Sequence, residues 1–375
     1  MEANSRGVVI VVKILMCAST EQNLEHPSMG SEREILGYCN ALAERGHTIY
    51  LVNILKETPD WSIDYDLCHM VNAGGYKSPY MFVAQICKIK KIPIFISPVY
   101  WPTEEVQKEI LNKFKDQNEE SIRSKFNVHL NGTRNMLFYA DMLLPNAEIE
   151  MDEVVKLMYA DGTKKEQVLY NVIHNGIDVE GEINIALGLK DLKFDDRLEE
   201  MLSDRFVLCV GRIEARKNQS VLIEAMKPLW EEDENLQLVL MGNKSLPYIK
   251  YIKEEIKGKN ILFCPSGPPG AVMKIMRRAS VCALVSMIET PGLVNLEAGG
   301  LNKPLVVAER GSVKEYLGER DGVFYCEPTD IPSVTEALRG ALASGEVESL
   351  GEFIRETYDY RKIAKDLEDV YKTLV

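Results

Sequence analysis

The sequence lacks the features that would place the chain across a membrane, on a nucleic acid or around a metal ion. No apolar run reaches the ~18 residues that a membrane-spanning helix needs. None of the eight cysteines falls in a C-x-x-C or zinc-ligand spacing. The net charge of −13 is spread over both halves, which argues against the basic face that duplex binding requires. No repeat period or low-complexity tract appears, so solenoid and disordered classes are disfavoured.

The positions of the cysteines and of Lys13 indicate a cytoplasmic protein. Most cysteines lie inside apolar runs such as "FVLCVG" and "ASVCALV", which predicts buried, reduced thiols and a cytoplasmic protein. Lys13 interrupts the first apolar run, which favours a buried strand over a secretory signal. The basic stretch "CKIKKIP" (Cys87–Pro93) is best explained as a solvated helix end. We therefore expect at most peripheral contact with the inner face of a membrane.

The length and the apolar pattern predict an α/β protein with two domains. A chain of 375 residues exceeds what one core usually organises. Short apolar runs alternate with amphipathic segments of helical length, which is typical of parallel sheets covered on both faces. The runs are "VVIVVKILMC", "TIYLVNI", "IPIFIS" and "DMLLP" in the first half, then "RFVLCVG", "LQLVLMG", "NILFCP", "SVCALVS" and "PLVVA". We predict two doubly wound, Rossmann-like domains that face each other across a cleft.

The domain boundaries are expected near residues 178 and 355. The segment "VIHNGIDVEGEIN" runs from an apolar strand end into Asn-Gly and Asp turn residues, which indicates a join between 1–178 and 179–355. The last segment, 356–375, has an amphipathic helical pattern with Ile363 and Leu367 on its apolar stripe. In open parallel sheets ligands bind beyond the carboxyl ends of the strands, so the residues after each run are candidates for the site.

A cluster of cations follows the strand that ends at Gly211. Arg212 and Lys217 come after it, just before Asn218 opens a helix. A helix N-terminus is already positive, so cations beside it are unfavourable unless an anion lies between them. A phosphate would accept from the arginine, the lysine and the helix amides together. We predict that Gly211, Arg212 and Lys217 bind a phosphate.

Arg216, in the same stretch, is a weaker candidate for this role. The alternative for these arginines is an ordinary surface ion pair with Glu214 or Glu224.

A second candidate segment, "IETPGLVNLEAGG", carries two glutamates eight positions apart. Glu289 follows a predicted strand, and Gly292 makes a turn that leaves the amides of Leu293 and Val294 at a helix N-terminus. Glu297 comes one turn later. Carboxylates repel a phosphate but accept from hydroxyls, and a nucleotide sugar has hydroxyls on both sides of its diphosphate. The alternative for Glu297 is a glutamate stabilised only by the helix dipole.

These segments, with "VIHNGID" and "PLVVAERGSVKEYL", resemble retaining glycosyltransferases of family 4, which have the GT-B fold. The resemblance is good in the second half and weaker in the first. It implies that Glu289 contacts the transferred sugar, that Glu297 contacts the ribose hydroxyls, and that Arg212 and Lys217 hold the diphosphate. The family's Gly-Phe-Gly segment is "PGLV" here, so the contacts with the sugar differ.

In the first half, "HPSMGSEREILG" is similar to the family's glycine-rich loop and helix. Gly30 and Ser31 stand where two glycines are common, which makes both candidates for donor binding. Many relatives carry a histidine after the strand that matches "IPIFIS", but this chain reads "SPVYWPTEE". Tyr100 and Trp101 are suited to stacking on an acceptor sugar, and core packing is an equal alternative. No catalytic histidine can be carried over.

The resemblance implies a metal-independent hexosyltransferase without a cofactor, whose donor is a UDP- or GDP-sugar. Residues 1–178 would bind a hydroxyl-bearing glycan or lipid-linked acceptor in polysaccharide or glycolipid assembly, 179–355 would bind the nucleotide sugar, and 356–375 would pack back on the first domain. "IDYDL" contains the Asp-x-Asp of a different, metal-dependent glycosyltransferase fold, but it precedes the strand start "CHMV". A sugar-nucleotide epimerase or hydrolase and a non-catalytic binding module remain alternatives.

Overall fold

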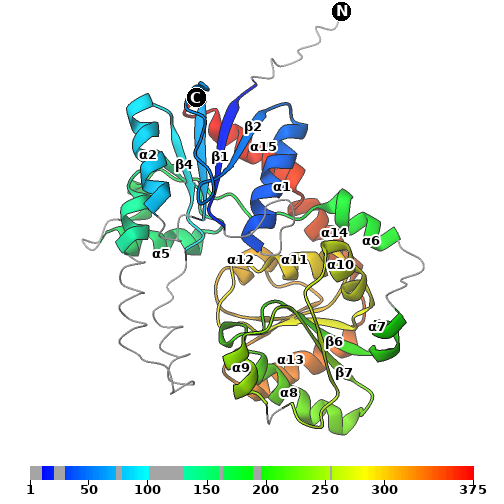
Figure 1. The fold of residues 1–375 in the computed structure, drawn as a ribbon. Coiled ribbons are helices and arrows are strands. Elements are labelled where there is room, and N and C mark those ends of the chain that lie inside the picture. Colours follow the sequence, from blue (N-terminus) through cyan, green and yellow to red (C-terminus); the bar gives the residue numbers. More distant parts are fainter. Residues whose placement is uncertain are drawn as a thin grey trace, which may run out of the picture. The chain divides into compact units, whose positions relative to one another are not determined.

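The computed structural model describes residues 11–20, 30–72, 78–100, 131–159, 164–188, 196–253 and 256–375 (Figure 1). The chain divides into two compact units. In the described part, the first unit contains the residues up to Tyr100, those from 131 to His174, and Tyr360–Val375. The second unit runs from Asn175 to Asp359. That the two domains face each other across a cleft stays a prediction.

The first unit contains a five-stranded parallel sheet in the order β2-β1-β3-β4-β5. Its strands are β1 (Lys13–Ala18), β2 (Thr48–Asn53), β3 (Leu67–Val71), β4 (Ile94–Ser97) and β5 (Met142–Leu143). Its helices include α1 (Gly30–Glu44), α2 (Ser78–Lys90), α5 (Glu148–Met158) and the short η1 (Lys165–Gln167). Every residue of β3, β4 and β5 is buried, as expected for strands covered on both faces. The strand order reverses between β1 and β3.

The last helix, α15 (Tyr360–Tyr371), belongs to the first unit. The Tyr371 hydroxyl lies 2.7 Å from Nδ1 of His69 on β3, and Nε2 of that histidine lies 2.9 Å from the Ser97 hydroxyl on β4. Burial lowers the pKa of His69 to about 3, so the imidazole is neutral. This chain of hydrogen bonds fixes the end of α15 to two central strands.

The second unit contains a six-stranded parallel sheet in the order β11-β10-β9-β6-β7-β8. Its strands are β6 (Phe206–Val210), β7 (Gln237–Met241), β8 (Ile261–Cys264), β9 (Val281–Leu284), β10 (Leu305–Ala308) and β11 (Val323–Cys326). From β6 the chain adds β7 and then β8 on one side of the sheet. It then adds β9, β10 and β11 on the other side, starting next to β6. The switch point therefore lies between β6 and β9.

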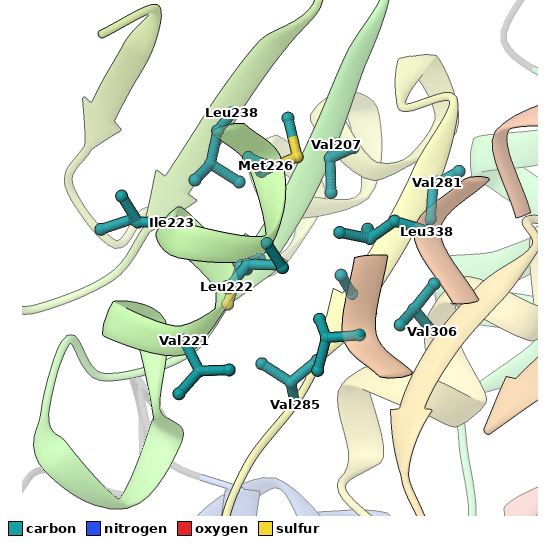
Figure 2. Packing of buried hydrophobic residues seen from close by; sticks show 14 of the residues in the cluster. Val207, Val221, Leu222, Ile223, Met226, Leu238, Val281, Val285, Val306 and Leu338 are labelled. Atoms are coloured by element: carbon teal, nitrogen blue, oxygen red, sulfur yellow. The ribbon is translucent and has the colours of Figure 1, made fainter. Parts of the chain in front are cut away.

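Helices of the second unit, among them α11 and α13, pack against this sheet. Those in the described residues are η2 (Val179–Ile183), α6 (Asn184–Gly188), α7 (Asp196–Met201), η3 (Ala215–Lys217), α8 (Gln219–Glu232), α9 (Leu246–Tyr251), α10 (Pro269–Arg278), α11 (Leu293–Gly300), α12 (Val313–Leu317), α13 (Ile331–Ser344) and α14 (Glu348–Thr357). Leu222 and Met226 of α8 and Leu338 of α13 pack with Val207 and Val281 of the sheet (Figure 2). Each such side chain contributes about 1.5–3 kcal/mol when fully buried. This core fixes the strand ends that carry the site.

The apolar runs of the sequence all give strands, and the fold of two parallel-sheet units is confirmed. The runs do not indicate β11, an edge strand with three of its four residues only half-buried. The terminal amphipathic segment is broken between α14 and α15. Between the two helices, the carbonyl of Tyr358 accepts a hydrogen bond from the amide of Ile177 at 2.7 Å. This carbonyl is therefore bonded to a distant segment and not within a helix.

Within the described residues, no helix combines the length and apolarity needed to cross a membrane. All eight cysteines are free and buried, as the sequence predicts. Asp66 of the Asp-x-Asp segment accepts a hydrogen bond from the amide of Lys13 at 2.7 Å, which gives this carboxylate a role at the start of β1.

A buried carboxyl group in α1 predicts a pH-dependent stability. Glu34 is 3% exposed, and burial raises its pKa to about 7, while a long hydrogen bond of 3.4 Å from Tyr38 lowers it slightly. The folded chain therefore holds a proton that the unfolded chain releases near pH 4.5. The stability from this group is present below pH 4.5 and is lost as the pH rises to about 7. Glu34→Gln is expected to remove this loss, with a gain of about 3 kcal/mol above pH 7.

Urea unfolding at pH 5 and pH 8 measures this effect. The difference in unfolding free energy between Glu34→Gln and the wild type should grow toward pH 8. Glu44→Gln, on the same helix but 55% exposed, serves as the control and should show little change. A difference for Glu34→Gln that stays constant with pH would contradict the prediction.

Candidate functional site

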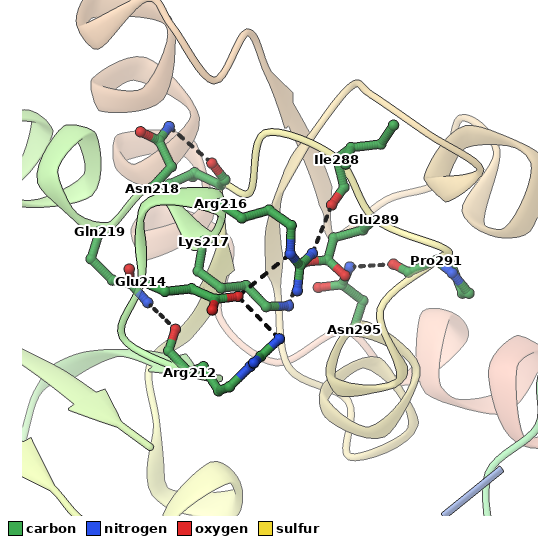
Figure 3. Close-up of polar contacts among 11 residues, drawn as sticks. Arg212, Glu214, Arg216, Lys217, Asn218, Gln219, Ile288, Glu289, Pro291 and Asn295 are labelled. Atoms are coloured by element: carbon green, nitrogen blue, oxygen red, sulfur yellow. Dashed lines mark hydrogen bonds and ion pairs between the residues drawn. The ribbon is translucent and has the colours of Figure 1, made fainter. Parts of the chain in front are cut away.

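The candidate site lies at the switch point of the second sheet, where the carboxyl ends of β6 and β9 are adjacent. Open parallel sheets bind ligands at this position. The segments that follow the two strands, 211–218 and 285–292, meet there, because the amide of Met287 donates to the carbonyl of Arg216 at 2.8 Å. Figure 3 shows charged side chains from both segments converging.

Glycines at the strand ends allow this close approach. Gly211 and Gly242 follow β6 and β7 with φ of +151° and +150°. A Cβ on Gly242 would lie 2.0 Å from the carbonyl oxygen of Gly211, and one on Gly211 would lie 3.3 Å from Cε of Lys217. The predicted site residue Gly211 thus leaves room for the Lys217 side chain.

Asn218 fixes the direction of the segment after β6. It takes the left-handed conformation with φ of 58°, which asparagine tolerates better than most residues. Its side-chain amide donates to the carbonyl of Val285 at 3.1 Å and to that of Pro328 at 2.6 Å. This turn ends η3 and starts α8, so Lys217 projects from the loop at the switch point.

The structure brings Lys217 and Glu289 into direct contact. Nζ of Lys217 ion-pairs with Oε1 of Glu289, and the two side chains are 11% and 8% exposed. Nη1 of Arg216 lies 3.3 Å from the same oxygen and donates to the carbonyl of Ile288 at 3.2 Å. Burial acts to raise the pKa of Glu289, but the charges of Lys217 and Arg216 outweigh it and bring the pKa below its ordinary value. Glu289 is therefore a buried, ionised carboxylate.

Arg212 lies at the exposed edge of this cluster. Its side chain is 56% exposed, and Nη2 lies 3.4 Å from Oε1 of Glu214. Nε of Arg216 lies 3.5 Å from the same oxygen, so both arginines form the alternative ion pair with Glu214, whereas Glu224 pairs with Lys227. Long, exposed pairs of this kind contribute little and are readily exchanged. That Arg212 binds a phosphate stays a prediction. Three cations face two carboxylates here, which leaves one excess positive charge for an anion.

The N-terminus of α11 adds amide donors beside Glu289. Gly292 caps the helix with φ of +81°, and a Cβ on it would lie 3.2 Å from Oε2 of Glu289. Among the described residues, no group accepts from the amides of Leu293 and Val294. Glu297 lies on the same helix and is 2% exposed. Its contact with a ribose stays a prediction.

The N-terminus of α8 has fewer free amides for a phosphate than the sequence indicates. The amide of Ser220 donates to the buried hydroxyl of Tyr248 at 2.8 Å. The side-chain amide of Gln219 donates to the carbonyl of Arg212 at 2.9 Å. Of the two helix starts at the switch point, α11 therefore offers the better anion donors.

The predicted residues of the first unit are described only in part. Gly30 and Ser31 are the first two residues of α1. The amide of Tyr100 donates to the buried carboxylate of Glu150 at 2.6 Å, and the Tyr100 ring packs against the core of the unit, which favours the core alternative. Trp101 lies outside the described residues.

Gly311 and Asn175 fix the backbone of the Glu289 loop, although the sequence pattern does not indicate either residue. Gly311 forms a β-bridge with Glu289, and a Cβ on it would lie 2.0 Å from the Glu289 carbonyl oxygen. Asn175 donates from its side-chain amide to the carbonyl of Thr290 at 3.1 Å. Both are in quoted motifs, "ERGS" and "HNGID", but only the tertiary contacts reveal what they do.

The part of the chain that carries this cluster is similar to a known family. Residues 192–359 match the model of the family described as glycosyl transferases group 1, and this range contains the whole cluster. Among curated proteins, D-inositol 3-phosphate glycosyltransferase of Corynebacterium glutamicum is 26% identical over 251 residues, which are 63% of this chain and 58% of the relative. The chain thus spans little more than half the length of that relative.

Solved structures match over almost the whole chain. Sucrose-phosphate synthase from Thermosynechococcus elongatus has a TM-score of 0.72 at 15% identity, with 97% of this chain and 99% of that chain covered. HepE of Anabaena, solved with UDP-glucose, has a TM-score of 0.69 at 16% identity, with 96% and 100% covered. Residues 192–359 thus match the model for glycosyl transferases group 1, and the chain as a whole has the fold of the GT-B glycosyltransferases.

Proposed function

We propose that the protein is a retaining glycosyltransferase that needs no metal ion. It moves a sugar from a UDP- or GDP-sugar to a hydroxyl of a glycan or lipid-linked acceptor, in the assembly of a polysaccharide or glycolipid. The observation that carries the proposal is the pair of cations Lys217 and Arg216 on Glu289, with Arg212 beside them on Glu214, next to the amides of α11. The single excess positive charge neutralises part of a diphosphate's charge of about −2, and the amide donors of α11 stabilise the rest.

In this mechanism the bond from the sugar to the diphosphate breaks first, and an oxocarbenium-like transition state forms. Negative charge accumulates on the diphosphate as the bond lengthens. Lys217, Arg212 and the amides of Leu293 and Val294 stabilise this charge more strongly as it grows, which is the differential binding that catalysis requires. These groups supply the neutralisation for which other transferases use a metal ion.

Retention follows if the acceptor attacks from the face that the diphosphate leaves. The departing diphosphate oxygen then takes the proton of the acceptor hydroxyl while the new glycosidic bond forms. Glu289 accepts from hydroxyls of the transferred sugar, and Glu297 accepts from the ribose. Gly30 and Ser31 stay candidates for donor binding in the first unit. This route uses no nucleophile from the protein.

The relatives and the cysteines support this proposal. The D-inositol 3-phosphate glycosyltransferase has a hydroxyl-rich acceptor in its name, and HepE was solved with UDP-glucose. The eight free, buried cysteines fit a reducing compartment, so we place the reaction in the cytoplasm, with at most peripheral contact with the inner face of a membrane.

A thermal-shift screen tests the donor assignment. We expect a UDP- or GDP-sugar to raise the melting temperature, because a ligand at 100 times its Kd stabilises the folded state by about 2.7 kcal/mol. UDP-glucose, UDP-N-acetylglucosamine and GDP-mannose form the panel, and ATP and free glucose are the controls. Equal shifts with every compound, or no shift with any nucleotide sugar, would contradict the proposal.

Turnover then separates transfer from the alternative reactions. The donor identified by the screen is incubated alone and with a panel of glycan and lipid-linked acceptors. Free sugar or an epimer formed without an acceptor indicates a hydrolase or an epimerase. Tight donor binding without turnover on any acceptor indicates a binding module. A glycosylated product that forms only with an acceptor is the expected result.

A further inference from the structure

Arg216 is the second cation, after Lys217, that contacts the Glu289 carboxylate. Its guanidinium bonds three groups: the Glu289 carboxylate at 3.3 Å, the carbonyl of Ile288 at 3.2 Å, and Glu214 at 3.5 Å. The planar guanidinium can hold several acceptors in fixed directions, whereas a lysine holds one point charge. Arg216 therefore fixes both the backbone and the side chain at the end of the β9 segment.

The two cations on Glu289 share a single oxygen. Lys217 and Arg216 both contact Oε1, whereas Oε2 lies next to Gly292 at the start of α11. Under the proposed function, Lys217 must turn toward a diphosphate when the donor binds. Glu289 then loses its nearest counter-charge while it stays buried. A buried carboxylate without a partner is strongly unfavourable or takes up a proton.

The other groups around Glu289 cannot replace that charge. Cys209 of β6 lies beneath the pair, and burial raises the pKa of its thiol to about 12, so it is neutral. The Ser286 hydroxyl and the Asn295 side chain, from the β9 segment and α11, carry no charge. Arg216 is the one remaining cation among the described residues that contact this carboxylate.

We infer that Arg216 is the positioning residue of Glu289: it keeps this carboxylate ionised and oriented while Lys217 exchanges from Glu289 to the diphosphate. The inference rests on the proposed function for the exchange step, but the hold on Glu289 is a property of the free protein. It assigns a role to a residue that the sequence marks only as a weak candidate for phosphate binding. Arg216 itself need not touch the substrate.

The experiment follows the ionisation of Glu289 by ¹³C NMR of side-chain carboxyl groups. The Glu289 signal is identified by its loss in Glu289→Gln. Wild type, Arg216→Gln and Arg216→Lys are titrated free and saturated with UDP, or with GDP where the screen identifies a GDP-sugar as the donor. In the free protein, Arg216→Gln should raise the midpoint of Glu289, and UDP should raise it further. Arg216→Lys should restore the midpoint most of the way, because it keeps the charge.

Turnover gives a second readout with the donor from the screen. Arg216→Gln should lower kcat by about 10- to 100-fold with KM for the donor nearly unchanged, because a misplaced group costs rate rather than binding. The acid limb of its pH profile should move to higher pH. Arg216→Lys should recover the acid limb but only part of kcat, because its shorter side chain lacks the planar guanidinium that bonds Glu289 and the Ile288 carbonyl in fixed directions.

Arg339→Gln is the matched control. Arg339 is 40% exposed, against 34% for Arg216, and it also pairs with two carboxylates, Glu232 and Glu336. It should leave both the Glu289 midpoint and kcat unchanged. The same Glu289 midpoint in Arg216→Gln and wild type, free and with UDP, would overturn the inference. Failure of both UDP and GDP to bind would instead refute the proposed function, and the free-protein titration would still decide the role of Arg216.

Discussion

Lys217→Met is expected to lower kcat/KM for the nucleotide-sugar donor by about 10²–10³-fold, the usual loss for one preorganised donor at a developing negative charge. Lys217 is nearly buried at the switch point, so its charge acts in a site largely screened from water. Methionine keeps the length and apolar contacts of the side chain but removes the charge. The steady-state rate of donor consumption with acceptor measures the effect, and circular dichroism checks that the variant is folded.

Lys227→Met provides the control for this substitution. Lys227 also forms an ion pair, with Glu224 on α8, but it is 38% exposed. Its replacement should change kcat/KM by less than about twofold, because exposed pairs contribute little. Arg212→Ala should act in the same direction as Lys217→Met. Near-normal turnover in folded Lys217→Met and Arg212→Ala together would refute the diphosphate assignment.

Gly311→Ala is expected to cause the second large loss, although residue 311 carries no functional group. Its φ is +87°, where an L-residue costs roughly 1–2 kcal/mol, and its Cβ would lie 2.0 Å from the carbonyl oxygen of Glu289. The neighbouring amide of Ser312 donates to that same carbonyl at 3.1 Å. The clash must therefore displace the backbone of Glu289, and a shift of about 1 Å lowers the rate by about 100-fold.

Gly345→Ala separates the steric effect from the conformational one. Gly345 has φ of +70°, but a Cβ added there would meet no atom of the described residues within 4 Å, so it carries the backbone strain without a clash. Both variants should lose some stability in thermal unfolding. Only Gly311→Ala should lose most of its kcat. Equal kcat in the two variants would show that Gly311 does not position Glu289.

Much of the fold is readable from the sequence because the strands are buried on both faces. Runs such as "FVLCV" (Phe206–Val210) and "VCAL" (Val281–Leu284) are apolar at every position, and their alternation with helical segments is typical of covered parallel sheets. The edge strand Val323–Cys326 gives a weaker pattern because it is only partly covered. The break before Tyr360 is not readable either, because a tertiary hydrogen bond from Ile177 produces it.

The chemical types of the site residues were also predictable, but their pairing was not. The position of Lys217 after a strand, and of Glu289 after another, identified both as candidates. The cation pattern indicates Lys217 for a phosphate, the family resemblance implies Glu289 for the sugar, and the free protein joins the two directly. The sequence indicates Arg216 only as a weak candidate for phosphate binding. Its contacts with Ile288 and Glu289 come from a distant segment, so the local sequence does not reveal them.

By itself, the sequence determined the alternation of strands and helices, the two covered sheets, and the kinds of charge that follow particular strands. These properties depend on local periodicity and on residues within a few positions of one another. The tertiary structure alone decided that β9 lies beside β6, which brings Lys217 against a carboxylate 72 residues away. Strand order is set by how the helices pack over the whole sheet, and no local pattern encodes that order.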